Sequence, residues 1–89
     1  MRIISQSGRI DIPYEVAVVY VEYESVIAKV CDERYAMGNY STEEKAVKSM
    51  EMLREKYLLY KSATNEKSFY EFFDNPKVFQ FPQDEDVEV

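Results

Sequence analysis

The side chains that could do chemistry in this chain are limited, because the sequence contains no histidine. Histidine is the usual general base for a serine or cysteine nucleophile and a common neutral metal ligand. The single cysteine, Cys31, needs a cationic neighbour to become a reactive thiolate, and Lys29 is the nearest candidate on its strand face. A small packed apolar role suits Cys31 better. We therefore predict that the protein is not an enzyme.

Paired carboxylates are the remaining candidates for acid–base chemistry or for binding Ca²⁺ and Mg²⁺. They occur at Asp32 and Glu33, and again in the acidic stretch from Asp84 to Glu88. Carboxylates in turns and tails are usually just solvated. A glycine-rich phosphate loop is also missing, because the chain has only Gly8 and Gly38. The sequence therefore predicts no catalytic residue, no metal site and no cofactor.

Arginine and tyrosine side chains could still bind a ligand, and a nucleotide-derived signal is the class that suits them. Its phosphates need fixed cations and its base needs an aromatic face. Arg34 and Arg54 are the candidate anion clamps, with Tyr35 or Tyr40 as the stacking partner. We expect such a site at a rim where the sheet meets the start of a helix or a second subunit.

The element expected to position these residues is one long amphipathic helix from Ser41 to Lys61. It begins with a predicted capping box, in which Ser41 accepts the N–H of Glu44 and the Glu44 side chain reaches back to Ser41. Neither glycine nor proline interrupts the stretch. Apolar residues recur at alternating spacings of four and three, which places them on one helical face: Ala46, Met50, Leu53, Tyr57 and Tyr60.

Met52 and Leu59 fall together on the helical wheel, well away from that apolar stripe. Two large apolar side chains on an outer face need cover. The aromatic segment from Phe69 to Phe73 could supply it within the chain, or a second subunit could do so. We expect the second arrangement, and therefore predict a homodimer with Met52 and Leu59 in its interface.

Patterns typical of strands occur in the sequence both before and after the predicted helix. They predict strands over residues 2–6, 9–12, 16–23, 26–31, 35–40 and 78–81. The strand over 16–23 is apolar on both faces for half its length, which is typical of a central strand or of one covered by a partner. Turns are expected at Ser7–Gly8, at Glu24–Ser25 and over 32–34, and Gly38 marks a possible bulge.

These elements predict an α+β fold in one small domain, residues 1–89. We expect a mostly antiparallel β-sheet with the long helix packed on one face. A short second helix is predicted over residues 66–73, with Asn65 as its cap. The acidic tail over 83–89 is expected to be partly mobile.

Composition and charge exclude several classes of partner. A formal net charge of −6 argues against binding a nucleic-acid backbone and against an anionic membrane surface. The N-terminus turns polar too soon for a signal peptide, and no stretch is apolar enough to span a bilayer. With a single cysteine no internal disulfide can form, so we expect a cytoplasmic protein.

Several stretches at both ends and in the helix carry a resemblance, and they read MRIISQ, DIPYE, YSTEEKA, MEMLR and FQFPQDE. In these stretches the chain resembles short uncharacterised proteins of Gram-positive bacteria and of their phages and prophages. The order of strands followed by a helix is more distantly similar to phage proteins that counter Thoeris immunity by sequestering cyclic ADP-ribose-type signals. This resemblance implies a phage or prophage setting and an anti-defence role.

Two functions from different classes follow as expectations. The first is a small non-enzymatic binding protein that sequesters a cyclic nucleotide signal. The second is a protein-interaction or assembly subunit that binds a host or phage protein without a small ligand. A cationic cleft lined by arginine and tyrosine favours the first, and a broad apolar patch without such a cleft favours the second.

Overall fold

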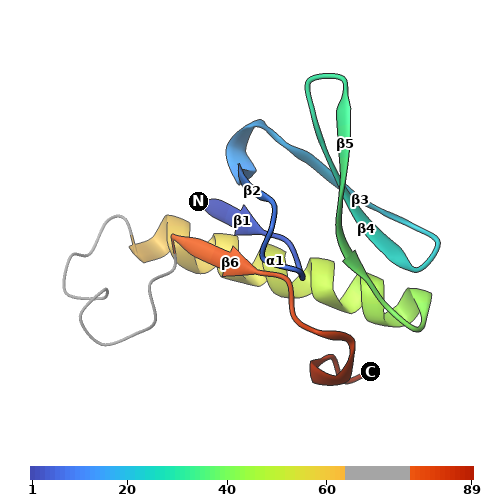
Figure 1. Ribbon diagram of the computed structural model, residues 1–89. Helices are drawn as coiled ribbons and strands as arrows, with labels where there is room; N and C mark the ends of the chain where they lie inside the picture. Colours follow the sequence, from blue (N-terminus) through green and yellow to red (C-terminus); the bar gives the residue numbers. More distant parts are fainter. Residues whose placement is uncertain (64–76) are drawn as a thin grey trace.

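The computed structural model describes residues 1–63 and 77–89 of the chain. Figure 1 shows two small β-sheets and one long helix. In chain order the elements are β1 (Arg2–Ile4), β2 (Asp11–Pro13), the 3-10 helix η1 (Tyr14–Val16), β3 (Val18–Glu22), β4 (Ser25–Val30), β5 (Glu33–Asn39), α1 (Glu43–Ala63), β6 (Val78–Gln80) and the 3-10 helix η2 (Asp84–Asp86).

The predicted α+β class is confirmed, and all six predicted strands are present with shifted ends. The single sheet that we expected is instead divided into two sheets of three strands each. The second helix predicted over residues 66–73, like the aromatic segment from Phe69 to Phe73, lies outside the described residues.

The first sheet has the strand order β2–β1–β6 and joins the two ends of the chain. β1 is antiparallel to β2, with Ile3 opposite Ile12, and parallel to β6, with Ile3 opposite Phe79. Parallel neighbours need a long connection, and here the whole second sheet and α1 lie between them. Ile3 is completely buried as a result of its central position.

The second sheet is an antiparallel meander in the order β3–β4–β5. Two-residue turns join its strands at Tyr23–Glu24 and at Cys31–Asp32, not at the turn positions that we predicted. The first residue of each turn has a φ of 56°, in the left-handed region that non-glycine residues rarely adopt. Cys31 is therefore exposed at a hairpin tip, and the predicted packed role for it is wrong.

β3 lies at an edge of this sheet, so the prediction of a central strand is wrong. The central strand is β4, where Val26, Ile27 and Ala28 are all buried. On β3, by contrast, Val18 is 64% exposed. A central position in the sheet therefore does not explain why β3 is apolar. The other interpretation of that pattern is that a partner covers the exposed face of β3.

The expected irregularity near Gly38 is present in the pairing of β4 with β5. Val26 is opposite Gly38 while the next residue, Ile27, is opposite Ala36, so the ladder shifts register at this point. A Cβ atom on Gly38 would come within 2.8 Å of the Tyr40 ring. Glycine is therefore needed here because the ring packs against the backbone.

The helix α1 begins at Glu43, and the residue that caps it is Thr42 instead of Ser41. The Thr42 hydroxyl accepts the backbone N–H of Lys45 at 3.2 Å. With Thr42 as the cap, the third residue of the helix is Lys45, whereas a capping box needs a glutamate there. The predicted hydrogen bond from this side chain back to the N–H of the capping residue is therefore absent. The Ser41 N–H instead donates to the Asp84 carboxylate at 2.7 Å.

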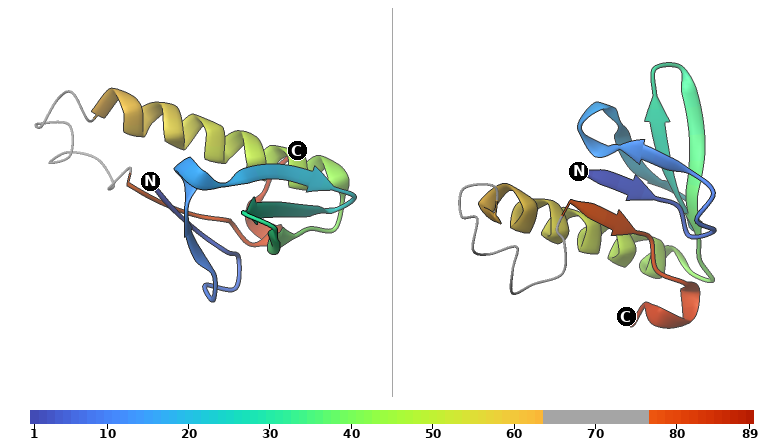
Figure 2. Two further views of the ribbon diagram at one scale, coloured as in Figure 1. Left: turned by 90° about the horizontal axis from the view of Figure 1, so that it is seen from above. Right: turned by 60° about the vertical axis from the view of Figure 1, so that its left-hand side comes forward.

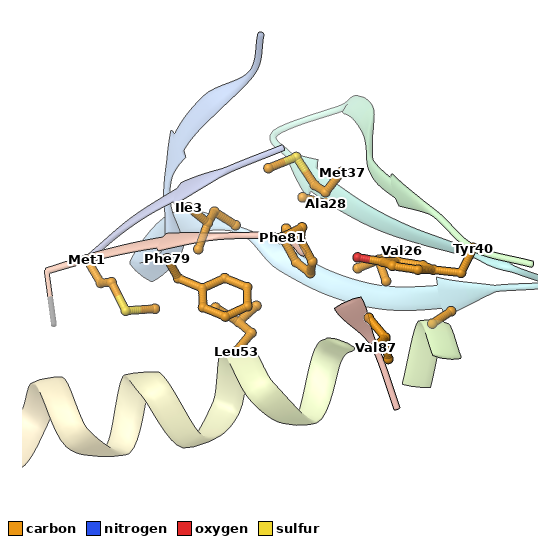
Figure 3. Packing of buried hydrophobic residues seen from close by; sticks show 11 residues of the cluster. Met1, Ile3, Val26, Ala28, Met37, Tyr40, Leu53, Phe79, Phe81 and Val87 are labelled. Carbon is orange, nitrogen blue, oxygen red and sulfur yellow. The ribbon is translucent and has the colours of Figure 1, made fainter. Parts of the chain in front are cut away.

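The core lies between α1 and the two sheets (Figure 3). From the predicted stripe, Ala46 and Leu53 are buried, and Met50, Tyr57 and Tyr60 are half-buried. Above Leu53, the rings of Phe79 and Phe81 meet edge to face with centroids 5.1 Å apart. Ser49 is also buried on this face, and its hydroxyl donates to the Ala46 carbonyl at 2.8 Å.

The acidic tail returns to the start of α1, as Figure 2 shows. Val87 is 3% exposed and belongs to the core cluster. The Pro82 carbonyl accepts hydrogen bonds from the Tyr40 hydroxyl at 2.9 Å and from Gln6 Nε2 at 3.1 Å. Lys45 Nζ donates to the Asp84 carbonyl at 3.0 Å. These contacts hold residues 82–87 against α1 and against the segments that directly follow β1 and β5.

Candidate functional site

Arg34 projects from β5 on the outer face of the second sheet and reaches across β4 to β3. Its Nε donates to the Tyr20 hydroxyl at 2.8 Å, and its terminal nitrogen forms an ion pair with Glu22. The Tyr20 hydroxyl, followed by the Glu22 carboxylate, raises the pKa of Arg34. The guanidinium is thus already engaged, although about half of the side chain is exposed.

The other predicted ligand-binding residues lie on different parts of the surface or inside the core. The Tyr35 hydroxyl donates to the Glu33 carboxylate at 2.8 Å, on the sheet face opposite to Arg34. Tyr40 is 7% exposed, and burial raises the pKa of its hydroxyl. Arg54 is exposed on α1, and its side chain forms no hydrogen bond or ion pair with another described residue. The structure therefore does not bring the four residues together as a clamp.

Met52 and Leu59, the predicted interface residues, are brought together. They line an open hollow of about 350 Å³ between α1 and β6, and both are half-buried. Glu55 and Lys56 lie at its polar positions, and Phe79 of β6 completes the lining. The sequence could not place Phe79 here, because β6 reaches this position only through its pairing with β1.

A second open hollow, of about 380 Å³, lies at the start of α1 beside the C-terminal residue. Val47 and Val89 supply its apolar surface, while most of its other lining side chains are carboxylates. Only one of these lining residues, Lys48, carries a positive charge. This arrangement suits a basic group better than an anion. The residues that line it are Glu43, Glu44, Val47, Lys48, Glu51 and Val89.

A cluster of three tyrosines connects η1 to the last turns of α1. The ring centroids of Tyr14 and Tyr57 are 4.6 Å apart, and those of Tyr57 and Tyr60 are 5.9 Å apart. Lys61 Nζ lies 5.8 Å from the Tyr57 centroid. The helical stripe predicted Tyr57 and Tyr60, whereas no periodic pattern in the sequence marked Tyr14.

Next to this cluster the α-amino group of Met1 forms an ion pair with Glu15 at 2.6 Å. That hydrogen bond is the main cause of a lowered pKa at Glu15. Among the described residues, no group of three or more histidine, cysteine, aspartate or glutamate side chains is placed to hold a metal ion. No helix of the described chain is long and apolar enough to cross a membrane.

Comparison of the chain with protein-family models, with curated proteins and with solved structures gave no match in any of the three.

Proposed function

We propose that this chain is a small non-enzymatic binding protein, of the kind carried by phages and other mobile elements, whose ligand is a protein surface. The observation that supports it is the hollow formed by Met52, Leu59 and Phe79, where apolar side chains are presented without a cationic cleft. We propose that it acts in the cytoplasm, because the single cysteine is unpaired, as is usual in that reducing compartment.

The surface proposed to fill this hollow is a second copy of the chain. Glu55 and Lys56 are neighbours on its rim, so a two-fold axis passing near them sets each glutamate against the partner's lysine. Exposed ion pairs of this kind fix orientation more than they add affinity. The apolar contacts of Met52 and Leu59 then supply the association energy.

Light scattering tests this dimer with Leu59→Glu and Met52→Glu. We expect the wild-type chain to have the mass of two chains at micromolar concentration, and each variant the mass of one. Leu58→Glu is the matched control, because Leu58 is exposed on the other flank of α1 and its substitution leaves the dimer mass unchanged. A wild-type mass of one chain would contradict the proposal that Met52 and Leu59 form a dimer interface.

A cyclic nucleotide signal is the second candidate ligand, and the pairing of Arg34 with Tyr20 supports it. The Arg34 guanidinium lies 5.9 Å from the Tyr20 ring centroid on an exposed face, so a cation and an aromatic ring are adjacent there. A phosphate would have to displace Glu22 from Arg34. With this ligand, the chain would be an anti-defence protein that acts by sequestering the signal.

Titration calorimetry with cyclic ADP-ribose isomers and cyclic oligonucleotides separates the two candidates. If the Arg34–Tyr20 pair binds a nucleotide, Arg34→Ala weakens binding by roughly tenfold or more, since charged hydrogen bonds are lost. Binding that persists in both Arg34→Ala and Arg54→Ala places the site elsewhere. If none of these compounds gives heat of binding, nucleotide sequestration is ruled out.

A further inference from the structure

The free edge of β3 is open to strand pairing. Among the described residues, β4 is its only strand neighbour. The two-residue turn after Glu22 makes Glu22 and Ser25 a hydrogen-bonded pair, and such pairs alternate along an antiparallel ladder. Val19 and Val21 therefore direct their N–H and C=O groups away from β4. No hydrogen bond within the described chain uses these two outward N–H groups.

This edge lacks the features that usually protect an exposed strand. Edge strands are commonly blocked by lysine, proline or a bulge. β3 contains neither lysine nor proline, and its pairing with β4 runs without a register shift. Its single charged residue, Glu22, is held by Arg34. Exposed apolar side chains continue along the same stretch, at Val18 and at Tyr23, which is 79% exposed.

The helix supplies a floor for an additional strand. α1 packs against β3 and β4. In the view from above in Figure 2, β3 is drawn between α1 and β4, so β3 is the strand of this sheet nearest the helix in that view. Met52 and Leu59 occupy the flank of α1 that faces β6. The other flank carries Val47 and Leu58, the latter 61% exposed, with Arg54 between them.

We propose that the free edge of β3, with this flank of α1, binds an extended segment of another protein as an additional strand. The segment is apolar at every second residue, where its side chains face Leu58 and Val47. It carries basic residues, because exposed Glu24 follows β3 in the turn to β4, exposed Glu51 lies one helical turn after Val47 on α1, and the chain has a net charge of −6. This site is separate from the hollow at Met52 and Leu59.

A second copy of the chain does not fit this edge. A two-fold axis that pairs β3 with itself in an antiparallel ladder stands perpendicular to the sheet. Both α1 helices would then lie on the same face of the joined sheet. Because α1 packs against β3 in each copy, the two helices would be brought against each other at the joined edge. An extended segment that brings no helix avoids this clash.

Val21→Pro tests the proposal, because proline removes the outward N–H while the hydrogen bonds to β4 come from the alternate residues. Proline is tolerated at such an edge position. Val21→Ala is the matched control, since it loses the same side chain and keeps the N–H. Circular dichroism establishes that both variants are folded, and the same substitutions at Val19 provide a second pair if either is not.

The probe is a display library of random short peptides selected on each protein. We expect peptides with alternating apolar and basic residues to be enriched on wild type and on Val21→Ala. Their affinity for Val21→Pro should fall by roughly tenfold or more, because a backbone hydrogen bond is lost and the ring blocks the edge. Equal enrichment on Val21→Pro, or no enrichment on wild type, overturns the proposal.

Amide hydrogen exchange locates the bound peptide. At saturation with a selected peptide, exchange at Val19 and Val21 should slow by roughly tenfold or more, as expected for amides that gain a hydrogen bond. Exchange at Tyr20, already paired with β4, should change little. Unchanged exchange at Val19 and Val21 rules out strand addition. A proline-dependent loss of a wild-type dimer would instead assign the edge to a second copy.

Discussion

The Tyr40 ring determines which residue can occupy position 38. The ring is buried, and its hydroxyl is fixed by the hydrogen bond to the Pro82 carbonyl. Its edge lies so close to the Gly38 backbone that an added methyl group would be 2.8 Å from Cε2. Neither residue can move without disturbing the contact of the tail with β5.

We therefore expect Gly38→Ala to lower the free energy of unfolding by about 1–3 kcal/mol, the usual cost of overpacking a core. Tyr40→Phe is the comparison, because it keeps the ring and loses only the hydroxyl, at a cost of about 1 kcal/mol. Urea unfolding monitored by circular dichroism measures both. If Gly38→Ala is as stable as wild type, the ring is not fixed in the position described.

Single residues differ in how far the sequence could place them. Helical periodicity placed Ala46 and Leu53 in the core, because burial of one helical face follows from spacing alone. It could not place Tyr40, which is buried by a tail more than forty residues further along the chain. Cys31 was misplaced because its apolar character gave no sign of a hairpin turn.

The start of α1 provides a prediction at the scale of an element. Thr42→Ala removes the hydroxyl that caps the Lys45 N–H, so we expect a loss of about 0.5–2 kcal/mol in unfolding free energy. Ser41→Ala should cost less, because no helix N–H depends on the Ser41 side chain. Thermal unfolding of both variants makes the comparison. A larger loss for Ser41→Ala would restore Ser41 as the cap.

The helix and the strands were mostly predictable from the sequence, but the elements that pack beside each of them were not. Apolar alternation identified six strands, because the period of a strand is a local property. The same pattern could not show that β3 is an edge strand, since an apolar face can be buried by a helix as well as by strands. The cap moved by one residue because Asp84, distant in sequence, binds the Ser41 N–H.

At the scale of the whole molecule, the two ends of the chain meet in the first sheet. β6 pairs with β1, and the tail then continues to the start of α1. Local patterns cannot predict such a parallel pairing, because its partners are separated by more than seventy residues. The candidate clamp failed for a related reason, as Arg34 and Tyr35 alternate across β5 while Arg54 lies on α1.

Two carboxylates hold these long-range contacts together and make the stability of the fold depend on pH. The Ser41 N–H is the main cause of a lowered pKa at Asp84, and the α-amino group of Met1 is the main cause at Glu15. A carboxyl group with a lower pKa in the folded chain stabilises the fold above its unfolded pKa. That contribution is lost as pH falls through the folded value.

We therefore expect the urea midpoint to be nearly constant from neutral pH down to about pH 5, and to fall below about pH 4, where unfolded carboxyl groups begin to bind protons. Asp84→Asn and Glu15→Gln should each lower the midpoint at neutral pH and reduce its fall in acid. Asp86→Asn is the control, because Asp86 is exposed and forms no ion pair with a described residue. If Asp84→Asn keeps the full wild-type decrease in acid, the tail contact is not a source of acid sensitivity. Because the acid-dependent part of the stability would then come from other carboxylates, the same series measured with Glu15→Gln shows whether the N-terminal ion pair supplies it.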